Sequence, residues 1–80
     1  MNNIVKKGIY RHFKGNYYLV EDVATNSEDG SEYVVYRALY EDTKLYVRPL
    51  NMFLSKVDKY KYPDCNQTYR FELQNIKSTK

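Results

Sequence analysis

The segment from residue 33 to residue 53 constrains the fold most, because it has the pattern of a β-hairpin that ends abruptly. Its first run is rich in β-branched and aromatic side chains, which suit a pleated sheet better than a helix. The polar residues 41–44 separate this run from Leu45-Tyr46-Val47, a spacing typical of a hairpin loop. Pro49 has no backbone N–H to donate, so we expect the second strand to end there and a short helical turn to follow over residues 50–53.

Three other segments show the alternation of strands. Residues 8–13 and 69–76 alternate apolar and polar side chains, as half-buried strands do. Residues 17–24 alternate as well, but the Glu21-Asp22 pair interrupts the series and predicts a bulge or a strong bend. The remaining segments are predicted to be a turn at residues 14–16, an acidic loop at residues 25–32 and a long exposed loop at residues 59–68.

Eighty residues suit a single domain with a small core. We expect this core to span about residues 8–76, and the termini, residues 1–7 and 77–80, to be flexible. Ten tyrosines and three phenylalanines provide much of the area that so short a chain can bury. About five short strands with one short helical turn fit a small SH3-like barrel better than a sandwich, which needs more strands. The predicted fold class is therefore all-β, a small SH3-like barrel.

The composition narrows the class of protein. The sequence has no apolar run near the roughly 20 residues that a membrane helix needs, and no signal-peptide pattern at its start. Cys65 is the single cysteine, so it cannot form an internal disulfide. We therefore expect a cytoplasmic protein with no membrane partner. The net charge is only +3 and the bases lie in separate segments, so any binding of nucleic acid is predicted to be weak and salt-sensitive.

Signatures of metal and nucleophilic chemistry are missing from the sequence. One histidine and one cysteine far apart do not make a zinc site, and no Gly-rich phosphate-binding loop occurs. No serine or cysteine lies in a nucleophile motif. We therefore predict no metal, no cofactor and no catalytic residue.

The candidate site is a set of charged and aromatic residues. A guanidinium offers a bidentate fork to a carboxylate or a phosphate, and a phenol offers a ring face and a hydroxyl. The predicted ligand-binding residues are Arg11, His12, Ser27, Glu28, Tyr36, Tyr40 and Arg48. Structural roles are an open alternative, because Tyr36 and Tyr40 can pack in the core or at the rim of so small a barrel. Arg48 and Glu28 can likewise form an ordinary ion pair.

The side-chain direction of Arg48 is central to this site. Alternation along the second strand of the hairpin predicts that Val47 is buried and that Arg48 points to the opposite face. The residue before Pro49 lies at a strand end, where loops gather. We therefore expect Arg48 to be positioned by its strand and to be the residue most important for the function of the site.

Two functions from different classes remain open. The first is a noncatalytic binding module whose groove, between residues 25–32 and 49–53, takes a protein or peptide, a small anionic ligand or nucleic acid. The alternative is a small enzyme, or an accessory domain of an enzyme, that uses His12, Glu28 and Arg48. The missing nucleophile motif favours the binding module. A pKa of His12 far from about 6.5 would point to catalytic groups close to it.

Several sequence blocks together resemble a known family. The blocks are Gly8-Ile9-Tyr10-Arg11-His12-Phe13-Lys14-Gly15, Ser27-Glu28, Val34-Val35-Tyr36-Arg37-Ala38-Leu39-Tyr40, Val47-Arg48-Pro49-Leu50-Asn51-Met52-Phe53 and the closing Arg70-Phe71. At this spacing the chain resembles the bacterial proteins grouped as domain of unknown function 1653. It departs from their pattern at Tyr46, where the family usually has Trp, and in the loop after Glu28. The resemblance implies a compact β domain and a bacterial cytoplasmic origin, and it carries no established activity with it.

Overall fold

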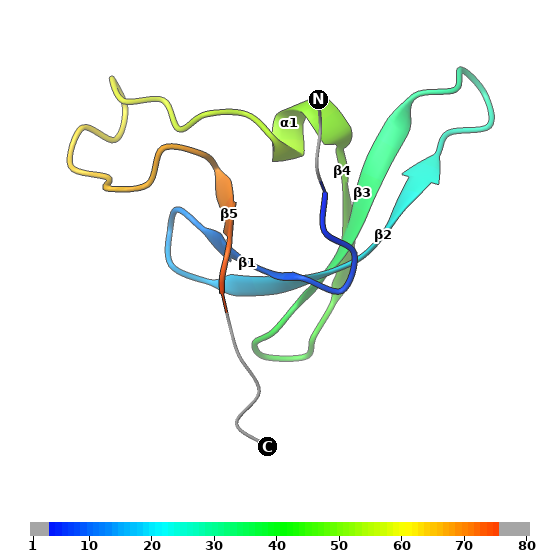
Figure 1. Cartoon of the computed structure of the whole chain (residues 1–80), viewed down its shortest axis with the longest axis horizontal. Helices are drawn as coiled ribbons and strands as arrows, with labels where there is room; N and C mark the ends of the chain where they lie inside the picture. Colours follow the sequence, from blue (N-terminus) through cyan, green and yellow to red (C-terminus); the bar gives the residue numbers. More distant parts are fainter. Residues whose placement is uncertain (1–3, 76–80) are drawn as a thin grey trace.

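The computed structural model describes residues 4–75, and its main feature is one antiparallel sheet with the strand order β4-β3-β2-β1-β5 (Figure 1). The elements along the chain are β1 (Ile9–His12), β2 (Tyr17–Thr25), β3 (Glu32–Ala38), β4 (Leu45–Pro49), α1 (Leu50–Phe53) and β5 (Phe71–Leu73). The predicted all-β class, the hairpin and the helical turn after Pro49 are confirmed. Within the described residues, no helix is long and apolar enough to cross a membrane.

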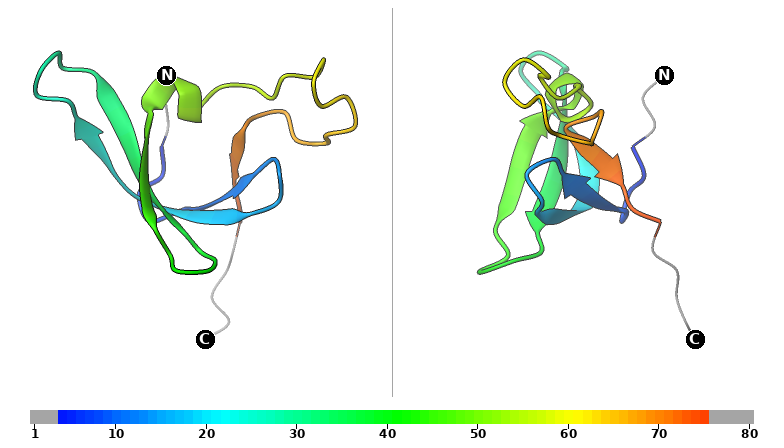
Figure 2. Two further views of the ribbon diagram at one scale, coloured as in Figure 1. Left: turned by 180° about the vertical axis from the view of Figure 1, so that it is seen from behind. Right: turned by 90° about the vertical axis from the view of Figure 1, so that its left-hand side faces the viewer.

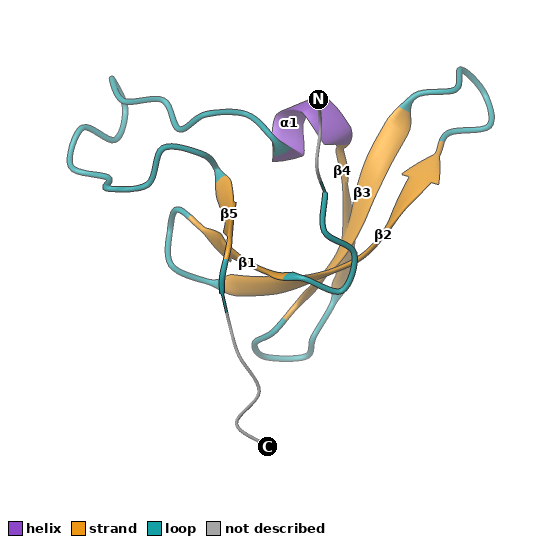
Figure 3. Ribbon diagram, viewed as in Figure 1, coloured by secondary structure: helices purple, strands orange, loops and turns teal. Residues whose placement is uncertain are grey.

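The sheet does not close into a barrel. The strand β5 pairs with β1, and β4 pairs with β3, but these two outer strands do not pair with each other in the described part of the chain. The chain crosses from β4 to β5 through α1 and the long segment that follows it (Figures 2 and 3). All three residues of the short strand β5 pair with β1. The predicted SH3-like closure is therefore not confirmed, and the sheet is open and strongly bent.

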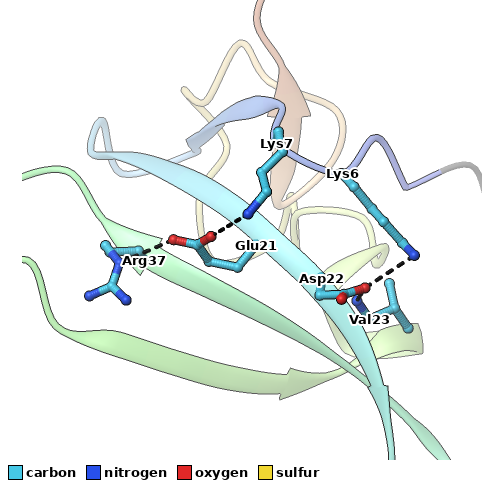
Figure 4. A network of polar contacts seen from close by, with 6 residues as sticks. All are labelled: Lys6, Lys7, Glu21, Asp22, Val23 and Arg37. Carbon is cyan, nitrogen blue, oxygen red and sulfur yellow. Dashed lines mark hydrogen bonds and ion pairs between the residues drawn. The ribbon is translucent and has the colours of Figure 1, made fainter.

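The predicted interruption at Glu21-Asp22 is a register shift in β2. The pairing of β2 with β3 shifts between Val20 and Asp22. Both acidic side chains leave the core at this bulge: Glu21 accepts from Lys7 at 2.7 Å and from Arg37 at 3.1 Å (Figure 4). Such exposed ion pairs add little stability, so their main effect is to satisfy the charges that the bend turns outward.

The core lies on the concave side of the sheet. Its buried members are Tyr10, Val20, Val34, Tyr36, Phe53 and Phe71. Phe53 from α1 stacks on Phe71 from β5, with ring centroids 4.0 Å apart and the planes inclined by 6°. This stack joins the two sides of the open sheet, which no backbone ladder joins within residues 4–75.

The predicted burial of Val47 is wrong. Val47 is 62% exposed, whereas Arg48 is half-buried. The cause is the register with β3: Arg48 pairs with Val34, which is fully buried, so both side chains point to the concave side. The expectation that Arg48 and Val47 point to opposite faces is confirmed.

The chain ends differ in part from the expected strands. The last predicted strand, residues 69–76, is a strand only at Phe71–Leu73, and Ile76 lies outside the described residues. Residues 4–7 are joined to the sheet, because the N–H of Lys7 donates to the carbonyl of Val20 at 2.7 Å. The segments 1–3 and 77–80, which we expected to be flexible, lie outside the described residues.

Candidate functional site

A cavity of about 460 Å³ lies between the concave side of the sheet and the segment after α1. Its lining is rich in cationic and aromatic side chains. The residues are His12, Phe13, Lys14, Tyr18, Arg48, Val57, Asp58, Lys61, Tyr62 and Arg70. Four of them are permanently charged cations at neutral pH, and only Asp58 is acidic. The volume is in the range of small-molecule sites, about 300–1,000 Å³.

Three strands or their ends bring His12, Arg48 and Arg70 to this cavity. His12 ends β1 and pairs with Phe71, so its side chain points to the same side as that buried ring. Arg48 points inward from β4, and Arg70 immediately precedes β5. The open side of the sheet thus places groups from both outer strands around one space.

Neutral partners hold both arginines. The Nε of Arg48 donates to the hydroxyl of Tyr36 at 3.1 Å, and its guanidinium lies 5.7 Å from the ring centroid of Phe71. The Nε of Arg70 donates to the hydroxyl of Ser55 at 3.1 Å. Neither guanidinium has a carboxylate partner among residues 4–75, whose ion pairs are Lys6–Asp22, Lys7–Glu21 and Arg37–Glu21. The charge of both arginines is therefore not compensated within the described structure.

His12 is held as a neutral imidazole. Its Nδ1 accepts a hydrogen bond from the backbone N–H of Lys14 at 3.1 Å, so the neutral ring carries its proton on Nε2. Burial, followed by the positive charges of Arg48, Arg70 and Lys14, lowers the pKa of His12 from 6.5 to about 4. This histidine is therefore not a solvated strand residue. The causes of its pKa, however, are burial and cations, which an anion-binding cavity supplies as readily as a catalytic one.

Tyr18 forms the aromatic wall of the cavity. Its hydroxyl lies 2.7 Å from that of Tyr40, and its ring packs edge-on against Phe71 with centroids 5.7 Å apart. Burial and the hydrogen bond to Tyr40 raise the pKa of Tyr18, so the phenol stays protonated. The wall therefore adds no negative charge to the cavity.

The structure brings together only part of the predicted site. His12 and Arg48 line the cavity, and Tyr36 and Tyr40 lie directly behind it, hydrogen-bonded to Arg48 and Tyr18. Tyr36 is only 4% exposed and belongs to the core. Its packing therefore agrees with the alternative in which Tyr36 has a structural role.

Three predicted residues lie elsewhere. Arg11 points to the face of β1 opposite His12 and donates to Oε1 of Gln67 at 2.8 Å. Ser27 and Glu28 lie in the exposed loop that joins β2 to β3, which projects away from the segment after α1 (Figure 1). The ion pair considered between Arg48 and Glu28 is not among the ion pairs of residues 4–75.

The predicted groove beside the acidic loop exists as a separate depression. It has a volume of about 500 Å³ and is lined by Gly30, Ser31, Glu32, Tyr33, Pro49, Leu50 and Asn51. None of the predicted ligand-binding residues lines it. The sequence thus predicted a depression at this place, but assigned to it side chains that the fold directs elsewhere.

Sequence reasoning missed the residues that the segment after α1 brings to the cavity. Lys61 and Tyr62 come from the loop predicted as merely exposed, and Arg70 comes from the start of the last predicted strand. Tyr62 packs edge-on against Phe13, with centroids 4.8 Å apart. The one available signal was the alternation of lysine and tyrosine over residues 59–62, a pattern that suits anionic partners with rings.

Potential metal ligands do not gather in the described part of the chain. No group of three or more His, Cys, Asp or Glu side chains is arranged there to hold an ion. The residues that line the cavity are instead suited to hydrogen bonding with an anion.

Comparison with known proteins places the chain in a family. Residues 8–73 match the family model described as Protein of unknown function (DUF1653). A crystal structure of a protein belonging to DUF1653 from Bordetella bronchiseptica is similar over 100% of both chains, with 26% sequence identity and a TM-score of 0.75. No curated protein matches the chain. The resemblance noted in the sequence is thus confirmed, and the chain belongs to the DUF1653 family.

Proposed function

We propose that this domain is a noncatalytic binding module that takes a small anionic ligand, a phosphate or a carboxylate, in the basic cavity. The observation that carries the proposal is that Arg48 and Arg70 line one cavity while only neutral hydroxyls hold them. Each guanidinium uses its Nε for this bond, which leaves its terminal nitrogens to donate to a ligand. A bidentate or shared bond to an anion is the interaction that such groups favour.

The charge balance of the cavity supports an anion. Four cationic side chains repel one another across the cavity, in whose lining Asp58 is the only acidic residue. They are Lys14, Arg48, Lys61 and Arg70. An anion bound among them would relieve this repulsion. Burial, and after it the charges of three of these cations, lower the pKa of His12, so the imidazole adds no positive charge of its own at pH 7.

The enzymatic alternative has weaker support. It required Glu28 to act with His12 and Arg48, but Glu28 lies in the exposed loop between β2 and β3 and does not line the cavity. Asp58 is the one carboxylate that lines the cavity, but no hydrogen bond or ion pair joins it to His12 within residues 4–75, and the Nδ1 of His12 accepts from a backbone N–H. A binding role needs no such partner.

The test is a titration of the protein with inorganic phosphate, monitored by the NMR chemical shifts of the backbone amides. We expect saturable shifts at His12, Lys14 and the residues around Arg70. Arg48→Gln and Arg70→Gln should each weaken binding by about 10-fold or more, because each removes hydrogen bonds from a charged group. Arg37→Gln is the matched control, since it removes the same charge from an arginine that already has a carboxylate partner, Glu21.

Two results would contradict the proposal. The first is the absence of any saturable shift around the cavity. The second is an equal loss of affinity in Arg37→Gln and Arg70→Gln, which would mean that phosphate responds only to the net charge of the protein.

A further inference from the structure

A second cavity adjoins the basic one. It has a volume of about 310 Å³ and shares Phe13, Lys14, Lys61 and Tyr62 with the first cavity. The two spaces are therefore two parts of one surface, divided by these four side chains. Together they exceed what one phosphate group would fill, so the surface has room for a ligand with a second part.

The two parts differ in charge. The first contains both arginines, whereas the second has the two shared lysines and adds Pro63 and the carboxylate of Asp64. A phosphate is therefore favoured in the first part, where the arginines lie, and disfavoured beside Asp64. The second part suits the less charged portion of a ligand, and a carboxylate there can accept a hydrogen bond from an amino group.

The shared wall is suited to a flat ring. Phe13 and Tyr62 meet edge to face at 64°, and the Nζ of Lys14 lies 5.9 Å and 5.7 Å from their respective centroids. The lysine stem is flexible and its ammonium is attracted to phosphate, so a bound anion can draw it off the rings and free their faces for stacking. The backbone fixes Tyr62, because its N–H donates to the carbonyl of Asp58 at 2.9 Å and its carbonyl accepts from Cys65 at 3.2 Å.

We propose that the joined cavities bind a nucleotide unit, with its phosphate between Arg48 and Arg70 and its base against Phe13 and Tyr62. This inference rests on the proposed function, since it uses the same arginines for the anion. It adds the aromatic ring as the second requirement of the ligand. The unit has two sources, a free nucleotide or a nucleotide within a single strand, and the test separates them.

The experiment compares four probes by calorimetry and amide NMR: inorganic phosphate, ribose 5-phosphate, adenosine and adenosine 5′-monophosphate. Ribose 5-phosphate is the matched probe because it lacks only the base. We expect adenosine 5′-monophosphate to bind at least about 5-fold more tightly than ribose 5-phosphate, as stacking of one base on an aromatic side chain provides. Adenosine alone should bind much more weakly than either phosphate ester.

Variants of Tyr62 then test whether its aromatic ring causes the tighter binding of the nucleotide. Tyr62→Ala should weaken binding of the nucleotide at least about 5-fold more than binding of ribose 5-phosphate, so that the ratio of the two affinities falls towards one. Tyr62→Leu retains apolar packing and guards against local unfolding, and it should behave in the same way. Tyr60→Ala is the matched control, because Tyr60 lies in the same loop but is 100% exposed and lines neither cavity.

The outcomes separate the two proposals. If ribose 5-phosphate binds as tightly as the nucleotide, or if Tyr60→Ala weakens the nucleotide as much as Tyr62→Ala, the ring site is refuted and the anion site stands. If no phosphate compound binds, both are refuted. A 5′-phosphorylated single-stranded oligonucleotide identifies the source: tighter binding than the mononucleotide assigns the site to strands, and weaker binding assigns it to free nucleotides.

Discussion

Acidification should destabilise this domain through His12 before its carboxylates lose their charge. The imidazole faces Lys14 on its own turn, Arg48 from β4 and Arg70 from the start of β5, with Asp58 as the one acid in the cavity. The pKa of His12 is about 4 in the folded chain against 6.5 ordinarily. Between these values the unfolded chain binds the proton and the folded chain does not, so stability falls as pH falls through this window.

The magnitude follows from the same two values. Between pH 7 and pH 5 the unfolded imidazole becomes protonated while the folded one stays neutral, which is worth about 2 kcal/mol at about 1.4 kcal/mol for each pH unit. His12 is only partly buried, so screening by solvent reduces the expected loss to about 1 kcal/mol. The stability from the lowered pKa values of Glu21, Asp22 and Asp29 is lost only as pH falls through their ordinary values of 4.5 and 3.8, which lie below pH 5.

The assay pairs urea unfolding at several pH values with NMR of the imidazole. Since the chain contains one histidine, its imidazole signal needs no assignment. His12→Gln is the control variant, because the amide oxygen of Gln can accept the bond from Lys14 without titrating. If His12→Gln loses as much stability as the parent between pH 7 and pH 5, or if the imidazole titrates near 6.5, the reasoning is refuted. Phosphate bound in the cavity should raise the imidazole pKa, since it opposes the cations.

Three substitutions test the fold and the site. Arg48→Lys loses the hydrogen bond to Tyr36, so it should lower the free energy of unfolding by about 0.5–1.5 kcal/mol and weaken phosphate binding. A loss above about 2 kcal/mol in urea unfolding would show that the role of Arg48 is structural and would contradict the site hypothesis. Phe53→Ala removes a fully buried ring and should cost about 3–5 kcal/mol in thermal unfolding, whereas Met52→Ala, at a 47% exposed position, should change stability by about 0.5 kcal/mol or less; equal effects would contradict the described core. Gly8→Ala places a Cβ 2.9 Å from a backbone oxygen, so it should cost about 1–3 kcal/mol, and a neutral result by the same method would show that this contact relaxes freely.

Local patterns made much of the fold predictable. The hairpin, the end of its second strand at Pro49 and the bulge at Glu21-Asp22 depend on backbone chemistry within a few residues, and all three are confirmed. The burial of Val47 depended instead on which face of an outer strand meets the core. That choice is made by the register with β3, and alternation alone cannot reveal it.

The candidate site was less predictable because most of its residues meet only through the fold. His12 and Arg48 could be selected as residue types that suit anions, and both line the cavity. Lys61 and Arg70 reach the same cavity only because the long segment after α1 folds back over β1. The predicted site also included Glu28 with His12 and Arg48 because it is charged, but Glu28 lies in the loop between β2 and β3 and does not line the cavity. Residues that were grouped because their side chains are charged or aromatic are therefore not all close together in the fold.

The pairing of β5 with β1 has a consequence for how the domain folds. Tyr10 pairs with Leu73, so this ladder joins segments that are far apart in the sequence, whereas β1, β2, β3 and β4 follow one another through short loops. Closing a long loop costs more entropy than closing a short one, so we expect the four-stranded meander to form first and β5 to dock late. His12 and Arg48 belong to the early strands and Arg70 to the late segment. On this order we expect the basic cavity to be the last part of the molecule to assemble. A ligand that bridges the arginines, as proposed above, should then slow unfolding by holding the final segment in place.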